Sequence, residues 1–464
     1  MSQHLHFMGI GGISMNGLAR HHQAAGDRVT GCDVADSATL ETLREIGIPV
    51  EVGHHVDHLD GVDILVISAA VAMNEPEVLE AQRRGIPVLK RMDLLRNLLA
   101  QHQGLGVTGT HGKSSTSGML ATILLHADQD PSVQLGASLP AIGGVMRHGD
   151  GPHLVAEVDE SDPGFANLAC LVAIVTNLED DHIAGEHDER RTYHASLADL
   201  EAATRSFAHN AEILVSCADW PALDALLSDH PQRVTYGEAE HATYRIEQLR
   251  LDGEGTTFRF TGPDASTEVT LQVPGRFNAL NAAGAMAAAH TVGIDLAKGA
   301  EALATYRGVG RRWDRWGEVR GAPIIDDYAH HPTEVAATLG AARETGRRVR
   351  AVLQPHRWVR TARHWPALAD AAALADEVLV VDVYGAGETP IPGISSQLIV
   401  ERLLASGANA RLTDLPHAAQ YLADTLEPND LILTLGAGDV WRVAAALVGA
   451  PEAHLDLVDR ETPQ

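Results

Sequence analysis

The ten residues VTGTHGKSST, at positions 107–116, combine glycines, one lysine and a run of hydroxyl side chains. They follow a short apolar run, GLGV, and lead into KSSTSGMLATILLH, a segment typical of a helix. A strand, a tight glycine turn and a helix N-terminus together form a setting in which backbone amides bind phosphate. We therefore expect Lys113 to reach the terminal phosphates of a nucleotide and the hydroxyl of Ser114 to coordinate magnesium.

This loop departs from the standard spacing GxxxxGK[ST], because Val107 occupies the first glycine position. The alternative interpretation is a glycine turn before an ordinary helix. Lysine is rare in the chain, however, since Lys90, Lys113 and Lys298 are the only three among 35 lysine and arginine residues. A phosphate-binding role explains the position of Lys113 better than a solvated surface charge does.

Acidic side chains follow two further apolar runs. The stretches LVAEVDESD and TNLEDDH supply a set of candidate metal ligands, namely Glu157, Asp159, Glu160, Glu179, Asp180, Asp181 and His182. Because the carboxyl ends of parallel strands meet at one edge of a sheet, we expect these groups to converge on one crevice. Oxygen ligands together with phosphate suit Mg²⁺. Glu157 and His182 are our first choices as magnesium ligands, although spacing alone does not select them. Any one of these acids could instead cap a helix or face water.

A second glycine motif, GIGGIS at positions 9–14, follows the first apolar run, and Asp33 ends the next one. This pattern is similar to a dinucleotide-binding fingerprint, with Ser14 in the position of the third glycine. It is equally consistent with a nicotinamide cofactor and with another diphosphate, such as that of a nucleotide sugar. Hydride chemistry would explain only this motif and not the loop at 107–116.

The elements that must position these motifs alternate between strand and helix. Short apolar runs such as LHFMGIGG, RVTGCD and VDILVISAA are separated by amphipathic segments such as SATLETLREIG. This pattern predicts an α/β fold with mainly parallel sheets. We expect three domains, at residues 1–98, 99–306 and 307–464. The stretch YRIEQLRLDGEGTTFRFTG in the second domain is predicted to be rich in strands.

Composition narrows the class of protein. A chain of 464 residues predicts about three domains, and 45% hydrophobic with 21% charged residues is typical of a water-soluble globular protein. With 62 acidic against 35 basic residues, the net charge of -27 argues against nucleic acid as a partner. No apolar run approaches the ~20 residues of a membrane helix, so no membrane partner is expected.

The start of the chain, MSQHLHFMGIGGIS, lacks the features of a secretory signal, and three cysteines lie far apart without metal-site spacing. We therefore expect a cytoplasmic protein without disulfide bonds.

Taken together, the motifs resemble those of the Mur ligase family of peptidoglycan synthesis, in order and in approximate spacing. The stretches that carry the resemblance are HFMGIGGISMNGLA, VTGTHGKSST, EVDESD, TNLEDDH, GRFNALNAA, GVGRRWD, DDYAHHPTEV, QPHRWVRT and DVYGAGETPIPG. They extend from about His6 to Gly438. The resemblance implies a Rossmann-like UDP-binding domain, a central domain like that of P-loop ATPases, and a Rossmann-like C-terminal domain.

The member of this family that the chain resembles most joins L-alanine to the carboxylate of UDP-N-acetylmuramate. The resemblance therefore implies UDP-N-acetylmuramate, L-alanine and ATP as ligands, Mg²⁺ as cofactor, and a monomer or weak homodimer. A murein tripeptide recycling ligase of the same family is the alternative within this class. A nicotinamide-dependent dehydrogenase is the alternative from another class, although it would leave Lys113 and EVDESD without a role.

The resemblance also assigns residues. The implied UDP-sugar site comprises Gly9, Gly11, Gly12, Ser14, Asp33 and Ser68. The implied ATP site comprises Gly109, Thr110, Gly112, Lys113, Ser114, Ser115, Asn278, Asn281, Arg312 and Asp327. The implied amino-acid site comprises Tyr328, His330, His356, Arg357 and Arg360. Magnesium would be held by Ser114, Glu157 and His182, and the implied catalytic residues are Lys113, Glu157, His182 and His330, the last as a hypothetical base.

Two departures from the family pattern are visible. Several relatives carry a carbamylated lysine that bridges two magnesium ions, but no lysine lies between Lys113 and Lys298 in this chain. Phe277 stands where the family usually has histidine before the NxxN pattern. An apolar ring at this position could pack under the adenine.

Overall fold

The computed structural model describes residues 2–68, 71–181, 183 and 194–450. Residue contacts divide the chain into two compact units. Unit 1 holds the described residues up to Ile183, together with Ser196–Thr243 and Gly284–Gly299. Unit 2 holds Tyr244–Ala283 and the described residues from Ala300 onward.

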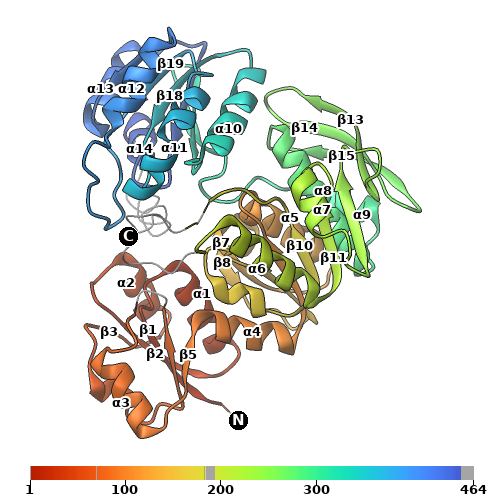
Figure 1. Cartoon of the computed structure of the whole chain (residues 1–464), viewed down its shortest axis with the longest axis vertical. Coiled ribbons are helices and arrows are strands. Elements are labelled where there is room, and N and C mark those ends of the chain that lie inside the picture. The colour runs from red at the N-terminus through yellow and green to blue at the C-terminus, as the bar shows by residue number, and fades with distance from the viewer. Residues whose placement is uncertain (1, 69–70, 182, 184–193, 451–464) are drawn as a thin grey trace. The chain divides into compact units, whose positions relative to one another are not determined.

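The first sheet of unit 1 is parallel, with the strand order β3-β2-β1-β4-β5. Figure 1 draws this sheet and its helices in red to orange. Its elements are β1 (His4–Met8), α1 (Ile13–Ala24), β2 (Arg28–Asp33), α2 (Ala38–Glu45), β3 (Val50–Val52), η1 (Val56–Leu59), β4 (Ile64–Ile67), α3 (Pro76–Arg84), β5 (Val88–Lys90) and α4 (Arg91–Gln101). Both faces are covered, because residues of α1, α2 and α4 pack in one apolar cluster and residues of α3 in another. A parallel sheet covered on both faces explains why β1 is wholly buried.

The second sheet of unit 1 has the order β12-β11-β10-β6-β9-β7-β8, and every pairing is parallel except that of β7 with β8. Its strands are β6 (Gln103–Thr108), β7 (Ser132–Leu139), β8 (Gly144–Arg147), β9 (His153–Glu157), β10 (Cys170–Val175), β11 (Ala211–Cys217) and β12 (Arg233–Gly237). The associated helices are α5 (Lys113–His126), α6 (Leu197–His209) and α7 (Pro221–Leu226). Helix α5 contacts β6, β7 and β9, and it is buried from Ser114 to Leu124.

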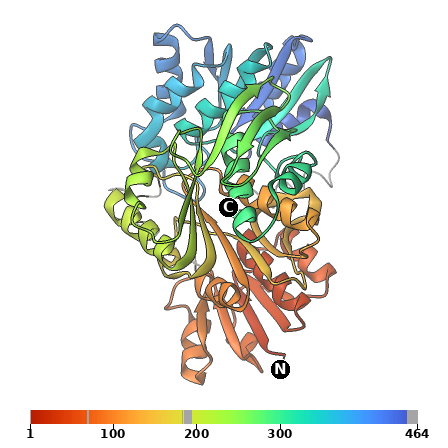
Figure 2. The same ribbon diagram turned by 90° about the vertical axis from the view of Figure 1, so that its right-hand side faces the viewer.

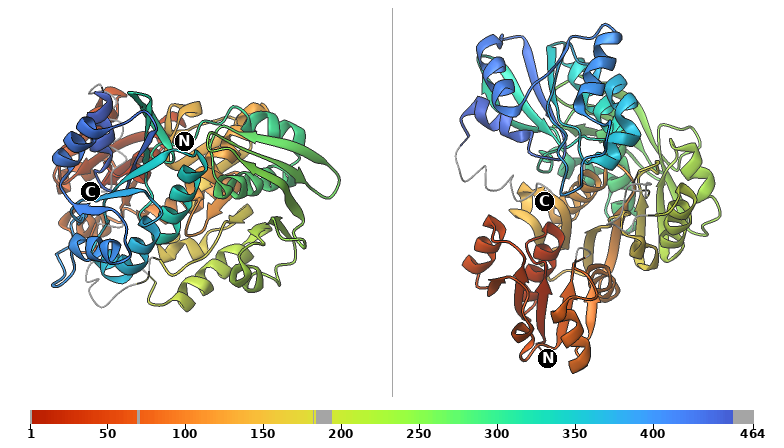
Figure 3. Two further views of the ribbon diagram at one scale, coloured as in Figure 1. Left: turned by 90° about the horizontal axis from the view of Figure 1, so that it is seen from above. Right: turned by 60° about the vertical axis from the view of Figure 1, so that its left-hand side comes forward.

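Unit 2 begins with three antiparallel strands and ends with a six-stranded sheet of order β16-β17-β21-β18-β19-β20. Only β16 is antiparallel to its neighbour in the six-stranded sheet. Figures 2 and 3 show this sheet, in teal to blue, with helices on both sides. The strands are β13 (Tyr244–Leu251), β14 (Thr256–Thr261), β15 (Ser266–Leu271), β16 (Asp314–Val319), β17 (Ala322–Asp327), β18 (Arg348–Leu353), β19 (Glu377–Val380), β20 (Ala410–Leu412) and β21 (Asp430–Leu435).

The helices of the second half are α8 (Arg276–Thr291), α9 (Leu296–Leu303), α10 (Pro332–Glu344), α11 (Trp358–Ala372), α12 (Ser396–Ala405), α13 (Leu415–Thr425) and α14 (Trp441–Val448). Helices α10, α11 and α12 pack on one face of the six-stranded sheet, whereas α13 and α14 pack on the other. Within the described residues, none of the helices combines the length and the apolar character that crossing a membrane requires.

The register of the second sheet brings three strand ends level with each other. Val107 of β6 pairs with Glu157 at the end of β9, and Thr108 pairs with Val175 at the end of β10. The residues after these strands therefore lie at one sheet edge, as the sequence predicts. The α/β class with mainly parallel sheets is confirmed, and α5 has the bounds of the predicted helical segment. The hairpin of β7 and β8 was not predicted. The proposed domain limits stay predictions.

Candidate functional site

The loop between β6 and α5 has a backbone that glycine alone can adopt without strain at two positions. Gly109 has a φ of +128°, and a Cβ atom there would lie 2.2 Å from Oγ1 of Thr176. Gly112 is the N-cap of α5 with a φ of +82°. Residues other than glycine rarely adopt such positive φ angles. The two glycines thus allow the chain to turn tightly from the strand into the helix N-terminus.

Residues directly after β10 brace this loop. Asn177 Oδ1 accepts a hydrogen bond from the amide of His111 at 2.8 Å, and Thr176 Oγ1 donates to the His111 carbonyl at 2.6 Å. The hydroxyl oxygen of Thr110 accepts from the amide of Glu179 at 2.8 Å. Thr176 and Asn177 were not among the residues predicted from the sequence. The stretch TNLEDDH contains both, but only its acids and His182 have the side chains of typical metal ligands.

Lys113, the first residue of α5, folds back over the loop. Its Nζ donates to the carbonyls of Gly109 at 2.7 Å and Thr110 at 3.1 Å, and it lies 2.7 Å from Oε2 of Glu160. Burial alone would lower the pKa of Lys113, but the carboxylates of Glu160 and Asp159 outweigh burial and raise the pKa above its ordinary value. The lysine is therefore a cation at neutral pH, held by two carbonyls of the loop and by Glu160.

Ser114 and Glu157 form the second contact at this sheet edge. The Ser114 hydroxyl donates to Oε1 of Glu157 at 3.0 Å, and the amide of Gly136 donates to Oε2 at 2.8 Å. A hydroxyl and a carboxylate at this distance are oxygen donors of the kind that Mg²⁺ takes. Ser115 is buried in α5. The predicted ligand His182 lies outside the described residues.

The first glycine motif lies at the ends of β1 and β2. Gly9 has a φ of +76°, and a Cβ atom there would lie 2.7 Å from Oγ of Ser68. The amide of Gly11 donates to Oδ2 of Asp33 at 2.8 Å, and the amide of Gly12 donates to the Gly9 carbonyl at 3.3 Å. Asp33 thus holds the loop in shape through one carboxylate oxygen. Ser14 belongs to α1, and its side chain is outside the described set.

In unit 2, Asp327 ends β17 and is buried. It accepts hydrogen bonds from the amides of Trp313 at 2.8 Å and Ala329 at 2.9 Å. Burial raises the pKa of Asp327 to about 6, against the opposing effects of the Arg312 charge and these amides. The guanidinium carbon of Arg312 lies 4.1 Å from the centre of the Tyr328 ring, a cation–π contact.

His330 and His356 lie next to each other in unit 2, with ring centres 5.6 Å apart. The Nδ1 atom of His330 lies 2.9 Å from the Tyr328 carbonyl. Since a carbonyl only accepts, Nδ1 carries the proton, and the lone pair of the neutral ring is on Nε2. Burial, reinforced by His330 when that ring is protonated and by the charge of Arg360, lowers the pKa of His356 well below its ordinary value. His356 is thus a neutral ring, 3.3 Å from a nitrogen of Arg360.

Arg357 precedes helix α11 and has a φ of +64°, in the left-handed region that non-glycine residues rarely adopt. Its guanidinium pairs with Oε1 of Glu388, and the other oxygen of Glu388 accepts from the amide of Val359 at 3.1 Å. One carboxylate thus fixes both the side chain and the helix start. Glu388 was not predicted as a site residue, although DVYGAGETPIPG contains it.

The two asparagines lie near the start of α8 and are buried. Asn278 donates through Nδ2 to the Pro274 carbonyl at 2.8 Å. Phe277 packs closely against Gly275, where a Cβ atom would lie 2.6 Å from the ring.

The structure therefore gathers the predicted residues into separate groups. In unit 1 the loop at 109–115 meets Glu157, and the loop at 9–12 meets Asp33 and Ser68. In unit 2, Arg312, Asp327 and Tyr328 lie near the histidine and arginine group of His330, His356 and Arg360.

Comparison with protein families gives three successive matches. Residues 4–103 match the model described as Mur ligase family, catalytic domain, residues 107–289 match the Mur ligase middle domain, and residues 311–438 match the Mur ligase, glutamate ligase domain. The chain belongs to the Mur ligase family, whose ligases depend on ATP.

Curated relatives and solved structures agree with this assignment. A UDP-N-acetylmuramate–L-alanine ligase from Deinococcus radiodurans is 44% identical over 458 residues, covering 97% of this chain and 94% of the relative. The structure of UDP-N-acetylmuramate–alanine ligase MurC from Thermotoga maritima has a TM-score of 0.80 and 30% identity, covering 97% of this chain and 99% of the other. A UDP-N-acetylmuramate:L-alanyl-γ-D-glutamyl-meso-diaminopimelate ligase from Neisseria has a TM-score of 0.59 and 27% identity, covering 67% of this chain and 100% of the other.

Proposed function

We propose that this chain joins L-alanine to the carboxylate of UDP-N-acetylmuramate at the expense of ATP, in the cytoplasmic part of peptidoglycan precursor synthesis. The observation that carries the substrate assignment is the 44% identity, over 97% of the chain, to the relative that bears this activity in its name. The phosphate loop with Lys113 supports ATP as the energy source.

The reaction needs two steps because a carboxylate is a poor acylating agent. A carboxylate oxygen attacks the γ-phosphorus of ATP, the bond to the bridging oxygen breaks, and ADP and an acyl phosphate result. The neutral amine of alanine then attacks the acyl carbon, inorganic phosphate leaves, and the amide nitrogen loses its extra proton to a base. Phosphoryl transfer of this kind depends mostly on positioning and charge neutralisation.

In this proposal the loop at 109–115 binds the triphosphate through its backbone amides and the N-terminus of α5. Lys113 exchanges the carbonyls of Gly109 and Thr110 for terminal phosphate oxygens and keeps Glu160 as its buried partner. Thr110 and Ser115 add hydroxyl donors. Because Glu160 stays beside the lysine, the ammonium group keeps its place in the loop when the nucleotide arrives.

Mg²⁺ would be held by Ser114 and Glu157, with His182 as a further ligand proposed from the family resemblance. When bound, this ion would neutralise charge on the phosphate oxygens. Gly136 has a structural part in the site, because its amide fixes the second oxygen of Glu157. Any side chain at position 136 would also collide with that carboxylate, since a Cβ atom would lie 2.6 Å from Oε1.

The UDP-sugar is assigned to the first sheet, with its diphosphate on the amides of Gly9, Gly11 and Gly12 and on Ser14. Asp33 and Ser68 lie beside this loop and would approach the uridine. The three predicted domains, at residues 1–98, 99–306 and 307–464, would then bind mainly the UDP-sugar, ATP and the amino acid, respectively. We propose a monomer or weak homodimer that requires neither nucleic acid nor a membrane.

Unit 2 supplies the proposed amino-acid site. Arg357 and Arg360 would bind the alanine carboxylate, while Tyr328 and His356, which both contact the His330 ring, would form a neutral wall beside them. His330 would take the proton from the alanine ammonium through Nε2. Arg312 and Asp327 would contact ATP, and Asn278 and Asn281 would lie on its adenine side, with Phe277 as an apolar surface.

Phosphate release with UDP-N-acetylmuramate, ATP and either L-alanine or the murein tripeptide separates this function from the recycling alternative. We expect release that depends on L-alanine. The recycling alternative has the support of the Neisseria ligase, which is named for the tripeptide substrate and is 27% identical. Family membership leaves the nicotinamide-dependent dehydrogenase without support, and titration with reduced cofactor should give no binding.

A further inference from the structure

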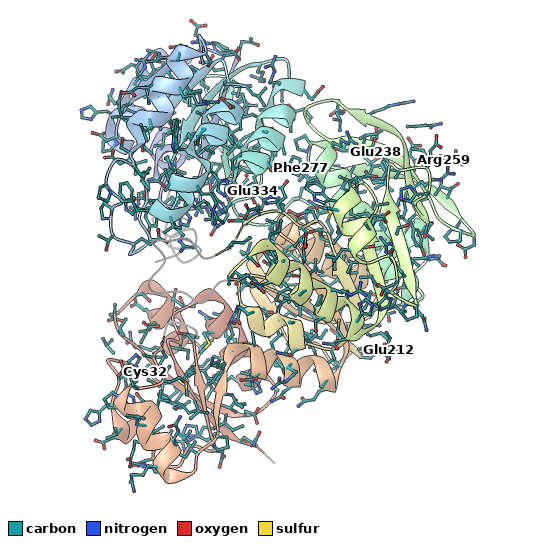
Figure 4. The ribbon with its side chains drawn as sticks, in the orientation of Figure 1. Cys32, Glu212, Glu238, Arg259, Phe277 and Glu334 are labelled. Carbon is teal, nitrogen blue, oxygen red and sulfur yellow. The ribbon has the colours of Figure 1, made fainter. Side chains whose placement is uncertain are left out.

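Four side chains with metal-binding atoms lie close together between the first sheet of unit 1 and the elements η1 and α3. They are His6 on β1, Cys32 on β2, His58 in η1 and Glu77 on α3, and one ligand atom from each lies within 4.8 Å of all the others. Figure 4 labels Cys32 at this position. The side chains of His6 and Glu77 are 3% and 0% exposed, and His58 is 8% exposed. This cluster, which we call the His-Cys-Glu cluster, is distinct from the phosphate loop.

One atom in the cluster has no satisfactory partner. Nε2 of His6 is buried and lies 3.3 Å from Oε1 of Glu77, but it makes no hydrogen bond of acceptable geometry to the described residues. A buried ring nitrogen without a hydrogen bond costs free energy. Its position, aimed at a carboxylate oxygen, is that of a metal ligand whose metal would lie between the two atoms.

The other ring nitrogens of both histidines are oriented from outside the cluster. Nδ1 of His6 lies 2.8 Å from the hydroxyl of Thr30, which also contacts His4 at 3.0 Å. Nε2 of His58 lies 3.5 Å from a carboxylate oxygen of Glu51. Histidines that bind metals usually donate their second N–H to such a group, which fixes the tautomer and the ring orientation.

The distances suit a small tetrahedral ion. With bonds of about 2.0–2.3 Å, tetrahedral zinc places two nitrogen or oxygen ligands about 3.3 Å apart and sulfur about 3.6 Å from either. Glu77 Oε1 lies 3.3 Å from both His6 Nε2 and His58 Nδ1. The Cys32 sulfur lies 3.8 Å from Glu77 Oε2 and 3.1 Å from Nδ1 of His54. To coordinate the ion, the sulfur would give up its contact with His54, and the four ligand atoms, which lie within 4.8 Å of one another, would move closer together.

Charge and ligand type favour zinc among divalent ions. Once Cys32 has lost its proton, its thiolate and the Glu77 carboxylate would carry two negative charges, which a divalent ion would neutralise in this buried site. One sulfur, two imidazole nitrogens and one carboxylate oxygen form a mixed set suited to Zn²⁺, whereas Mg²⁺ prefers oxygen ligands alone. Four protein ligands would leave no open position, as in structural zinc sites.

We propose that His6, Cys32, His58 and Glu77 form a structural zinc site in the first domain. Binding releases the Cys32 thiol proton to solvent. The ion ties α3 and η1 to strands β1 and β2. It also steadies the first glycine loop, because the Cys32 carbonyl accepts hydrogen bonds from the amides of Gly9 at 2.8 Å and Ile10 at 3.2 Å.

The test uses the whole 464-residue chain, stripped with a chelator, incubated with Zn²⁺ and then passed through a desalting column. Elemental analysis should find one zinc per chain, and zinc should raise the Tm. Cobalt in place of zinc should give a thiolate-to-cobalt charge-transfer band in the near ultraviolet. That band requires sulfur, so binding at the oxygen ligands of the phosphate loop cannot produce it.

Cys32→Ala should lose the charge-transfer band and the zinc-dependent rise in Tm. Cys217→Ala is the matched control, because Cys217 is also a buried cysteine outside any disulfide but lies on β11. If Cys32→Ala does not fold, His58→Asn at the edge of the cluster should reduce zinc content while keeping the fold. A wild-type chain without the band, or a Cys32→Ala chain that binds zinc as tightly as wild type, would show a metal-free hydrogen-bonded cluster and overturn the proposal.

Discussion

The Nζ atom of Lys113 lies 2.7 Å from Oε2 of Glu160, and Glu160 is 1% exposed. The sequence predicts Lys113 at a helix start and Glu160 after a strand, but it does not predict their pairing. The pairing explains how a chain with a net charge of -27 keeps one cation in its phosphate loop. A buried carboxylate holds the lysine in place, and the backbone carbonyls of Gly109 and Thr110 fix its direction.

Replacing Lys113 with methionine should lower kcat/KM by a factor on the order of 10²–10³, as does the loss of one preorganised group that stabilises transition-state charge. Lys298→Met is the matched control, because Lys298 is exposed on α9. It should retain activity within about twofold, as exposed substitutions generally do. Steady-state phosphate release measures both variants. Equal activities in the two would remove Lys113 from the proposed chemistry.

Gly109→Ala should raise the KM for ATP roughly tenfold or more, because a side chain at this φ costs about 1–2 kcal/mol before any collision is counted. The added Cβ would also meet Thr176 at 2.2 Å and disturb the loop brace. Gly340→Ala is the control, since its Cβ would contact nothing within 4 Å in helix α10. An unchanged KM in Gly109→Ala would show that the loop geometry does not govern nucleotide binding.

Asp327 should make the free energy of unfolding fall as the pH rises from about 4 to 6. Its folded-state pKa is raised from 3.8 to about 6, so the folded chain binds the proton more tightly than the unfolded chain. Its stabilising contribution is therefore fully present below about pH 4 and is lost as pH rises through 6, by roughly 3 kcal/mol in total. Asp327→Asn removes this titration. We expect the difference in Tm between wild type and variant to fall between pH 4 and 6 and then to level off. A difference that stays constant over this range contradicts the account of Asp327.

His330→Ala tests the proposed base. Loss of the base should lower kcat at saturating alanine by a factor of about 10²–10⁴, with partial recovery at high pH, where more alanine is already deprotonated. His417→Ala, an exposed histidine of α13, should behave as wild type. A variant that keeps kcat and only raises the KM for alanine would place His330 in binding instead.

Much of the fold and part of the candidate site could be predicted from local sequence. Helix α5 has the bounds of KSSTSGMLATILLH, and Glu157 ends a strand next to β6, because hydrophobic runs and turn residues mark where strands and helices end. The convergence of strand ends followed from parallel topology alone.

Contacts between distant segments could not be predicted in this way. The brace of Thr176 and Asn177 on the loop, the pairing of Glu388 with Arg357 and the position of Cys32 near Glu77 each join side chains far apart in the chain. Cysteine spacing gave no sign of a metal site, because the four candidate ligands come from four different elements. Such contacts depend on strand order and side-chain direction, which periodicity does not specify.

Phosphate release with UDP-N-acetylmuramate and ATP, compared with and without L-alanine, tests the proposed function most directly. The account predicts release that depends on L-alanine, with one phosphate and one UDP-N-acetylmuramoyl-L-alanine formed per ATP consumed. Release that requires the murein tripeptide, with none from L-alanine, would contradict it.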